Sequence, residues 1–191
     1  MIKKLFGVLF VITLLISCKT GTPIKRLSGE GMMYAMIYDY ENTPVSGVAI
    51  YINNRKIVDS DIQGRFILDK FKKGEYRIKL TKKGYETFED QFQYDPLQVL
   101  YFKIINAQQL LVLAETALDN IEYTAAENYL DRALQLEPNR PDILYLKGVT
   151  CYLQGKNEEA AAILENMIKK GSNDAPVTQL LEKIRPQESE E

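Results

Sequence analysis

The sequence predicts an α+β multidomain protein in which a small antiparallel β-sandwich is followed by an array of α-helical repeat hairpins. Three observations carry this prediction. Residues 32–105 contain short runs of Val, Ile, Tyr and Phe that alternate with polar residues at a period of two. After residue 105 the pattern changes to Ala- and Leu-rich segments with helical spacing, separated by Pro or Gly. The chain of 191 residues is long enough for two small domains.

Seven strands are expected in the first part, over residues 32–40, 48–53, 56–60, 64–68, 75–80, 86–94 and 98–104. Turn residues of the Asn, Asp, Gly and Pro types separate them. In the fifth strand Tyr76, Ile78 and Leu80 share one face, and Arg77 and Lys79 share the other. A sheet with one face in the core and one in water requires this alternation.

Four short motifs in this part are Pro44–Ile50, Ser60–Phe66, Gly74-Glu75-Tyr76 and Gly84-Tyr85. Together they resemble the carboxypeptidase regulatory-like domains, which are prealbumin-like sandwiches related to PEGA modules. Physical reasons support the match, because Asp61 can accept hydrogen bonds from its own turn and Gly64 can take a positive φ. Phe66, Tyr76 and Tyr85 offer large apolar areas to a small core. The resemblance implies a non-catalytic module over residues 32–105.

The helical part contains a spaced pattern of small and apolar residues, Ala126, Leu130, Ala133 and Pro138, which returns 34 residues later as Ala160, Leu164 and Met167. This pattern, with Gly148 and Gly155, resembles tetratricopeptide repeats. We expect two repeats over 106–137 and 138–171 and a closing helix over 175–184, so that the helical domain covers residues 106–185. The resemblance implies a protein-binding function.

Two repeats are fewer than the usual minimum of about three for independent stability. The first helix also follows the last strand with almost no linker. We therefore expect the helices to pack on the sandwich, and residues 32–105 and 106–185 to unfold together.

Candidate binding residues lie on two of the expected helices. Tyr145, Val149 and Tyr152 are spaced i, i+4 and i+7. The repeat resemblance places them, with Glu115 and Asp119, on the face that lines the concave groove of the family. They would form a peptide groove with aromatic anchors and an acidic wall. The alternative, that the tyrosines pack against a neighbouring domain, stays open.

Composition argues against several functions. The chain has no His, the commonest general base and metal ligand, and no spacing suggests a nucleophile with its base. We expect no enzyme, cofactor or metal, although carboxylate chemistry stays open. Residues 106–191 carry 8 Lys or Arg against 15 Asp or Glu, a net charge of −7. This acidic half argues against binding to nucleic acid, which requires a basic surface, and it favours a basic partner. Residues 186–191 form an acidic tail that we expect to be disordered.

Cys151 shares the expected core face of its helix with Leu144 and Gly148. We interpret it as a small buried apolar residue, with a reactive thiol as the alternative.

The N-terminus carries Lys3 and Lys4 followed by 12 mainly apolar residues, Leu5–Ile16. That run is shorter than the roughly 20 residues of a membrane-spanning helix and fits a signal peptide over residues 1–17. Leu15-Ile16-Ser17-Cys18 resembles the lipobox of bacterial lipoproteins. The resemblance implies cleavage before Cys18, a diacylglyceryl group on its thiol, and acylation, for example by palmitate, of its amine. Residues 18–31 then form the lipidated Cys and a flexible tether.

Two functions remain. The first is a lipid-anchored scaffold or assembly factor of the bacterial cell envelope that binds an envelope protein or peptide through its helical repeats. The second is an envelope module that binds glycan or peptidoglycan through the sandwich. Lys19 follows the Cys, as in outer-membrane lipoproteins, so the outer membrane is the expected location.

Replacing the acceptor thiol tests the anchor. Cys18→Ala should leave an unlipidated and unprocessed precursor, because no other residue of the motif can carry the diacylglyceryl group. Metabolic labelling with a fatty acid measures this. Equal label on the variant and the parent would contradict a lipoprotein.

Overall fold

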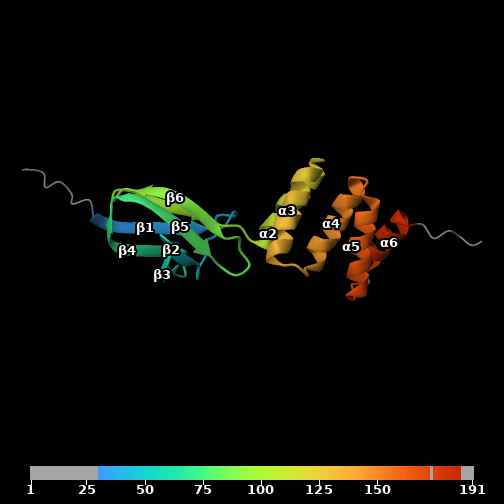
Figure 1. Cartoon of the computed structure of the whole chain (residues 1–191), viewed down its shortest axis with the longest axis horizontal. Coiled ribbons are helices and arrows are strands. Elements are labelled where there is room, and N and C mark those ends of the chain that lie inside the picture. The colour runs from blue at the N-terminus through green and yellow to red at the C-terminus, as the bar shows by residue number, and fades with distance from the viewer. Residues whose placement is uncertain (1–29, 173, 186–191) are drawn as a thin grey trace, which may run out of the picture.

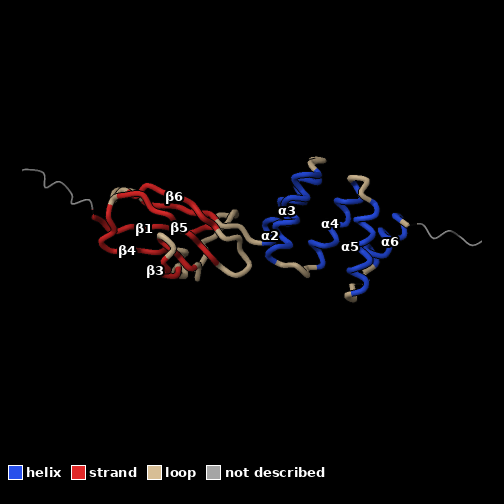
Figure 2. The backbone as a smooth tube through the Cα atoms, in the orientation of Figure 1, coloured by secondary structure: helices blue, strands red, loops and turns tan. Residues whose placement is uncertain are grey.

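The computed structural model describes residues 30–172 and 174–185, which form a β-sandwich followed end to end by helices (Figure 1). Strands and helices occupy separate parts of the described chain (Figure 2). The predicted fold class is therefore confirmed. The expected signal peptide, Cys18, the tether up to residue 29 and the acidic tail lie outside the described residues.

The sandwich consists of two sheets. The three-stranded sheet has the order β4 (Arg65–Lys72), β1 (Glu30–Tyr38) and β7 (Val99–Lys103). The four-stranded sheet has the order β3 (Arg55–Asp59), β2 (Ala49–Ile52), β5 (Gly74–Thr81) and β6 (Phe88–Tyr94). One pair departs from the expected antiparallel arrangement, because β1 and β7 run parallel. The chain crosses from β6 to the other sheet before β7, and a crossover connection permits parallel pairing.

The turn before β4 forms as the sequence suggests. The Asp61 carboxylate accepts hydrogen bonds from the backbone N–H groups of Gln63 and Arg65, each at 2.8 Å. Gly64 has φ +72°, and a Cβ there would lie 2.5 Å from the carbonyl oxygen of Ile37. Only glycine fits this position, because it has both a left-handed backbone and no room for a side chain.

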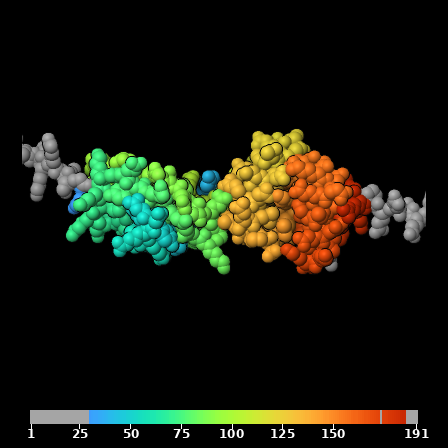
Figure 3. Space-filling model, in the orientation of Figure 1, coloured from blue at the N-terminus to red at the C-terminus, as the bar shows by residue number. Residues whose placement is uncertain are grey.

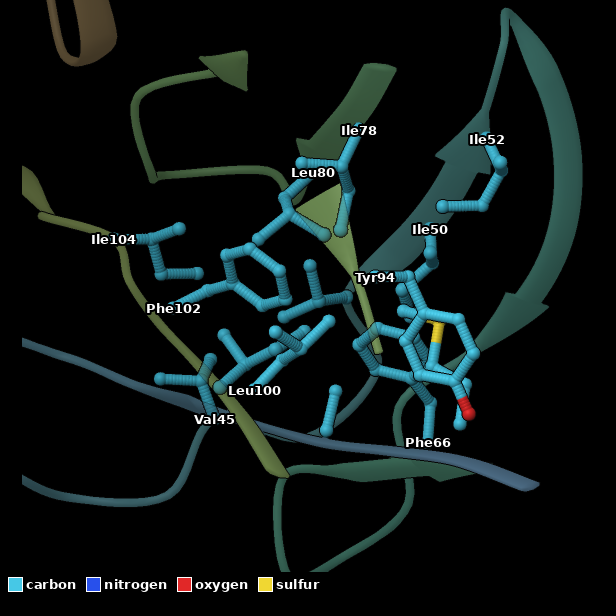
Figure 4. Packing of buried hydrophobic residues seen from close by; sticks show 14 residues of the cluster. Val45, Ile50, Ile52, Phe66, Ile78, Leu80, Tyr94, Leu100, Phe102 and Ile104 are labelled. Carbon is cyan, nitrogen blue, oxygen red and sulfur yellow. The ribbon is translucent and has the colours of Figure 1, made fainter. Parts of the chain in front are cut away.

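The sandwich core fills the space between the two sheets (Figure 4). Ile78 and Leu80 of β5 are fully buried while Arg77 is exposed, so the expected alternation is present. Phe66 and Phe102 stack across the core with ring centroids 6.4 Å apart. Tyr94 is also fully buried, although the sequence did not single it out.

The helices form two hairpins and a final helix: α2 (Ala107–Asp119) with α3 (Tyr123–Leu136), α4 (Pro141–Leu153) with α5 (Asn157–Lys169), and α6 (Ala175–Ile184). Small residues permit close helix contact. Gly148 of α4 is buried, and a Cβ at this position would lie 3.2 Å from Leu164 Cδ2 of α5. Ala126 and Ala160 are also fully buried.

The expectation that the helices pack on the sandwich is wrong. Within the described residues, no helix packs broadly on a strand, and the two parts meet end to end (Figure 3). Ile104 belongs to the sandwich core and Ile105 to the core of the first hairpin. Helix α2 begins two residues later, at Ala107, after a capping box in which Asn106 Oδ1 accepts from the Gln109 N–H at 2.9 Å. The early helix start directs α2 away from the sheets.

The last hairpin is covered by α6 instead of by the sandwich. Val177 of α6 packs with Leu164 and Met167 of α5 in a third core cluster. Arg185, directly after α6, forms ion pairs with Glu158 at 2.9 Å and Glu165 at 2.6 Å. The closing helix therefore provides the cover that two repeats need.

Because the cores are separate, a change in one should leave the other intact. Gly148→Leu should destabilise the helical part by about 1–3 kcal/mol, since the new side chain overfills the contact with Leu164. Hydrogen exchange resolved by residue would show faster exchange in α4 and α5 and unchanged protection in β1 and β5. Equal loss of protection in both parts would show instead that they unfold as one unit.

Candidate partner-binding surfaces

One side of α2 is exposed along its whole length. We call it the α2 surface, and it consists of Gln108, Val112, Glu115, Thr116 and Asp119. The opposite side carries the fully buried Leu110 and Ala114, which hold the helix against α3. Val112 is 44% exposed. The α2 surface thus combines one apolar residue with two carboxylates.

The predicted aromatic residues lie on α4 and are half-buried. Tyr145 packs against the cluster of α5 and α6 that contains Leu164 and Val177. The ring of Tyr152 lies under the ammonium group of Lys183 of α6, with the nitrogen 5.3 Å from the ring centroid. Both tyrosines therefore contact the closing helix and keep part of their surface accessible. Val149 is also half-buried.

The structure brings the predicted residues to two helices that meet at one end. The Arg140 guanidinium, just before α4, donates to the side-chain oxygen of Gln108 on α2 and to Asp142 at 2.9 Å. No hydrogen bond or ion pair within the described residues joins Glu115 or Asp119 to Tyr145 or Tyr152. The acidic and aromatic residues thus belong to adjacent but distinct surfaces.

Most other carboxylates near these helices are already paired. Glu127 of α3 accepts from Lys156 at 2.9 Å and from Gln154 at 3.1 Å, and these bonds hold the pKa of its carboxyl below the ordinary value. Asp131 of α3 pairs with Lys147 of α4. In contrast, neither Glu115 nor Asp119 forms an ion pair with any described residue. Glu115 and Asp119 are therefore available to a cationic partner, as are the exposed Glu122, Glu159, Asp174 and Glu182, which also form no ion pair with a described residue.

Cys151 is fully buried, so its interpretation as a small apolar residue is confirmed. Its thiol lies with the carboxylates of Glu127 and Glu159, all within 4.8 Å of one another. Burial raises the pKa of the thiol, and the two carboxylates raise it further. A thiol with a raised pKa is a poor nucleophile and a poor metal ligand, because both roles need the thiolate. Glu127 is, moreover, already occupied by Lys156.

Sequence reasoning missed a second surface on the sandwich. A cleft of about 520 Å³, here called the edge cleft, opens between β6 and β7 next to the helical part. Its lining includes Phe88, Asp90, Phe92, Tyr101 and Phe102. A signal was present in the sequence, since Asp90 stands between two phenylalanines in the same alternating row of β6.

The outer face of the three-stranded sheet also carries aromatic side chains. Tyr101 of β7 is 65% exposed and stacks with Tyr38 of β1, with ring centroids 6.4 Å apart. Tyr34 lies on the same face, next to Val99 across the parallel pair. The sandwich therefore presents tyrosines to solvent, which the absence of Trp from the sequence did not suggest.

Comparison with known proteins supports the helical assignment. Residues 117–184 match the family model described as tetratricopeptide repeat. This range runs from the last turn of α2 to the end of α6. The helical part is thus an array of tetratricopeptide type. A comparison of the sequence with curated proteins gives no match.

Similarity to solved structures is limited to part of the chain. The Bacillus anthracis TIE protein matches with a TM-score of 0.36 and 20% identity, over 41% of this chain and 17% of that one. A streptococcal ancillary pilin matches with a TM-score of 0.33 and 20% identity, over 41% and 30%. BcpA, the major pilin subunit of Bacillus cereus, matches with a TM-score of 0.32 and 15% identity, over 40% and 28%. The chain spans less than a third of each of these proteins. No helix in the described ranges is long and apolar enough to cross a membrane.

The contact between Tyr145 and the closing helix has a measurable consequence. Tyr145→Ala should destabilise the helical part by about 2 kcal/mol, roughly half the cost of emptying a fully buried aromatic site. Tyr152→Ala is the matched comparison, since its ring contacts α6 through Lys183 at the surface, and it should cost less than about 1 kcal/mol. Chemical denaturation monitored by far-UV circular dichroism measures both. Equal effects would show that Tyr145 does not support α6.

Proposed function

We propose that this protein is a non-catalytic, lipid-anchored scaffold or assembly factor of the bacterial cell envelope that binds a protein partner through its helical repeats. Tetratricopeptide repeats generally bind proteins, and the match over residues 117–184 supports this class of partner. The observation that carries the proposal is the α2 surface, where Val112 and two unpaired carboxylates face solvent.

The chemistry of the α2 surface suggests the kind of partner. Glu115 and Asp119 are one helical turn apart, so both carboxylates can meet Lys or Arg residues of one bound segment. Val112, on the same side of α2, adds an apolar contact beside them. A basic segment with apolar side chains, from an envelope protein, fits this arrangement. The net charge of −7 over residues 106–191 would speed its association.

The proposed anchor rests on the lipobox-like motif at Cys18, and Lys19 supports retention at the outer membrane. Two or three acyl chains would hold the protein stably, because each buried methylene contributes about 0.8 kcal/mol. The sandwich would stand between the tether and the repeats. The turn at Asp61 and Gly64 supports its assignment to the carboxypeptidase regulatory-like type.

A second candidate function has one observation in its favour. The stacked pair Tyr38 and Tyr101, with Tyr34 beside it, forms an aromatic face on the three-stranded sheet. Aromatic rings at the surface offer apolar stacking area together with a hydroxyl group, which suits the faces of sugar rings. Under this alternative the sandwich binds envelope glycan or peptidoglycan.

Charge reversal on the α2 surface tests the proposed function. The double variant Glu115→Lys with Asp119→Lys should lower capture of the protein partner at least about tenfold, because two attractive contacts become repulsive. Both side chains are exposed, so the free energy of unfolding should change by no more than about 0.5 kcal/mol. Crosslinking of the lipoprotein in its native envelope, followed by purification and mass spectrometry, measures the capture.

Asp69→Lys with Glu75→Lys is the matched control. Both residues are exposed on the sandwich, and the change in net charge is the same. The control should capture the partner as the parent does. Equal loss with both double variants would show an effect of net charge alone and contradict binding at α2. Recovery of glycan fragments without any protein would support the second function.

A further inference from the structure

The edge cleft lies between β6 and β7, the facing edge strands of the two sheets. Beside the helical part, the backbone N–H of Glu86 donates to the carbonyl of Ile105 at 2.9 Å, and Tyr85 forms an isolated bridge with Asn106. Beyond this point β6 and β7 separate, and each is the last strand of its own sheet. The cleft therefore runs between two unpaired strand edges, from the domain junction toward residues 95–98, which connect β6 to β7.

The wall formed by β6 is apolar except for one carboxylate. Phe88, Asp90 and Phe92 pair across the strand with Leu80, Ile78 and Tyr76 of β5, so all three side chains start on the core face. Phe88 and Phe92 are half-buried, and their ring centroids lie 5.9 and 6.1 Å from that of Phe102.

Asp90 is exposed between these two rings, and the described residues give it no ion pair. Its carboxylate accepts only the N–H of the next residue, Gln91, at 2.7 Å. Three other charged side chains line the cleft. Arg132 and Glu86 form a bidentate pair at 2.8 and 2.7 Å, and the Lys103 ammonium lies 6.0 Å from the ring centroid of Tyr40. Asp90 is thus the one carboxylate among the described lining residues of this cleft that forms no ion pair.

The wall formed by β7 offers backbone hydrogen bonds. The N–H of Ile104 donates to the Tyr38 carbonyl at 3.0 Å, so the backbone of residue 104 faces β1. Backbone groups alternate between the two sides of a strand, which turns those of Tyr101 and Lys103 toward the cleft. No described strand pairs with them there. An exposed edge of this kind is a template for an added strand.

We propose that the edge cleft binds an extended segment of a partner protein, which adds a strand to β7. The segment carries the pattern apolar, any residue, basic, any residue, apolar. Its apolar side chains lie against Phe88 and Phe92, and its Lys or Arg meets Asp90. The spacing matches because side chains that face one way recur every second residue on both strands. Hydrogen bonds between the two backbones provide affinity, and the row of side chains on β6 provides specificity. This site is separate from the α2 surface, and a partner could occupy both.

A charge exchange tests the side-chain register. The probe is the fluorescein-labelled peptide acetyl-Thr-Val-Ser-Lys-Ser-Val-Thr-amide, with Glu in place of Lys as its counterpart, and the protein is the mature lipoprotein in detergent micelles. Fluorescence anisotropy should show the Lys peptide binding at least about tenfold more tightly than the Glu peptide. Asp90→Lys should reverse this preference. Glu89→Lys is the matched control, because Glu89 lies on the opposite face of the same strand, and it should keep the preference for Lys.

Alternate backbone methylation tests strand addition without altering the protein. Two further peptides carry N-methyl groups on the odd or on the even residues. One set should abolish binding and the other should preserve it, since only alternate N–H groups of the peptide face β7. The Glu115 and Asp119 double variant should bind the Lys peptide as the parent does, which separates this site from the proposed function. Equal binding of the Lys and Glu peptides, no binding of either, or equal effects of the two methylation patterns would overturn the proposal.

Discussion

The structure depends on the three residues that join its two parts. The side chain of Ile104 packs in the sandwich core, that of Ile105 packs in the core of the first helical hairpin, and Asn106 caps α2. Two contacts hold this junction: the Glu86 N–H to the Ile105 carbonyl, and the bidentate pair of Glu86 with Arg132 of α3. The bidentate geometry restrains orientation as well as distance.

Both candidate surfaces follow from that junction. Because the helices extend away from the sandwich, α2 keeps one side free and β6 and β7 keep their edges open. The helical part instead covers its last hairpin with α6, and Tyr145 contributes to that cover. Holding two separate surfaces in one orientation is useful to a scaffold, since a partner that contacts both gains from a high effective concentration at the second site.

Much of the fold was predictable because its signals are local. Alternation located the strands, the Asp61 and Gly64 turn formed as expected, and the small residue Gly148 marked a helix contact. The parallel pairing of β1 with β7 was not predictable, because alternation assigns a face to each side chain but not a neighbour to each strand. The junction and the edge cleft could not be predicted for the same reason. Both depend on contacts between residues distant in sequence, such as Glu86 with Arg132. Of the candidate residues, Glu115 and Asp119 were expected to form the acidic wall of a groove that Tyr145 and Tyr152 also line, whereas the contact of Tyr145 with α6 required the structure.

We infer that the junction fixes the orientation of the helical array relative to the sandwich. Double electron–electron resonance between spin labels at Glu75→Cys and Ala162→Cys measures this directly, since both positions are exposed and Cys151 is buried. A fixed orientation should give a narrow distance distribution that broadens in Arg132→Ala. Arg185→Ala, which removes ion pairs within the helical part only, should leave it narrow. A distribution that is already broad in the parent, or one that Arg132→Ala leaves unchanged, would contradict the account.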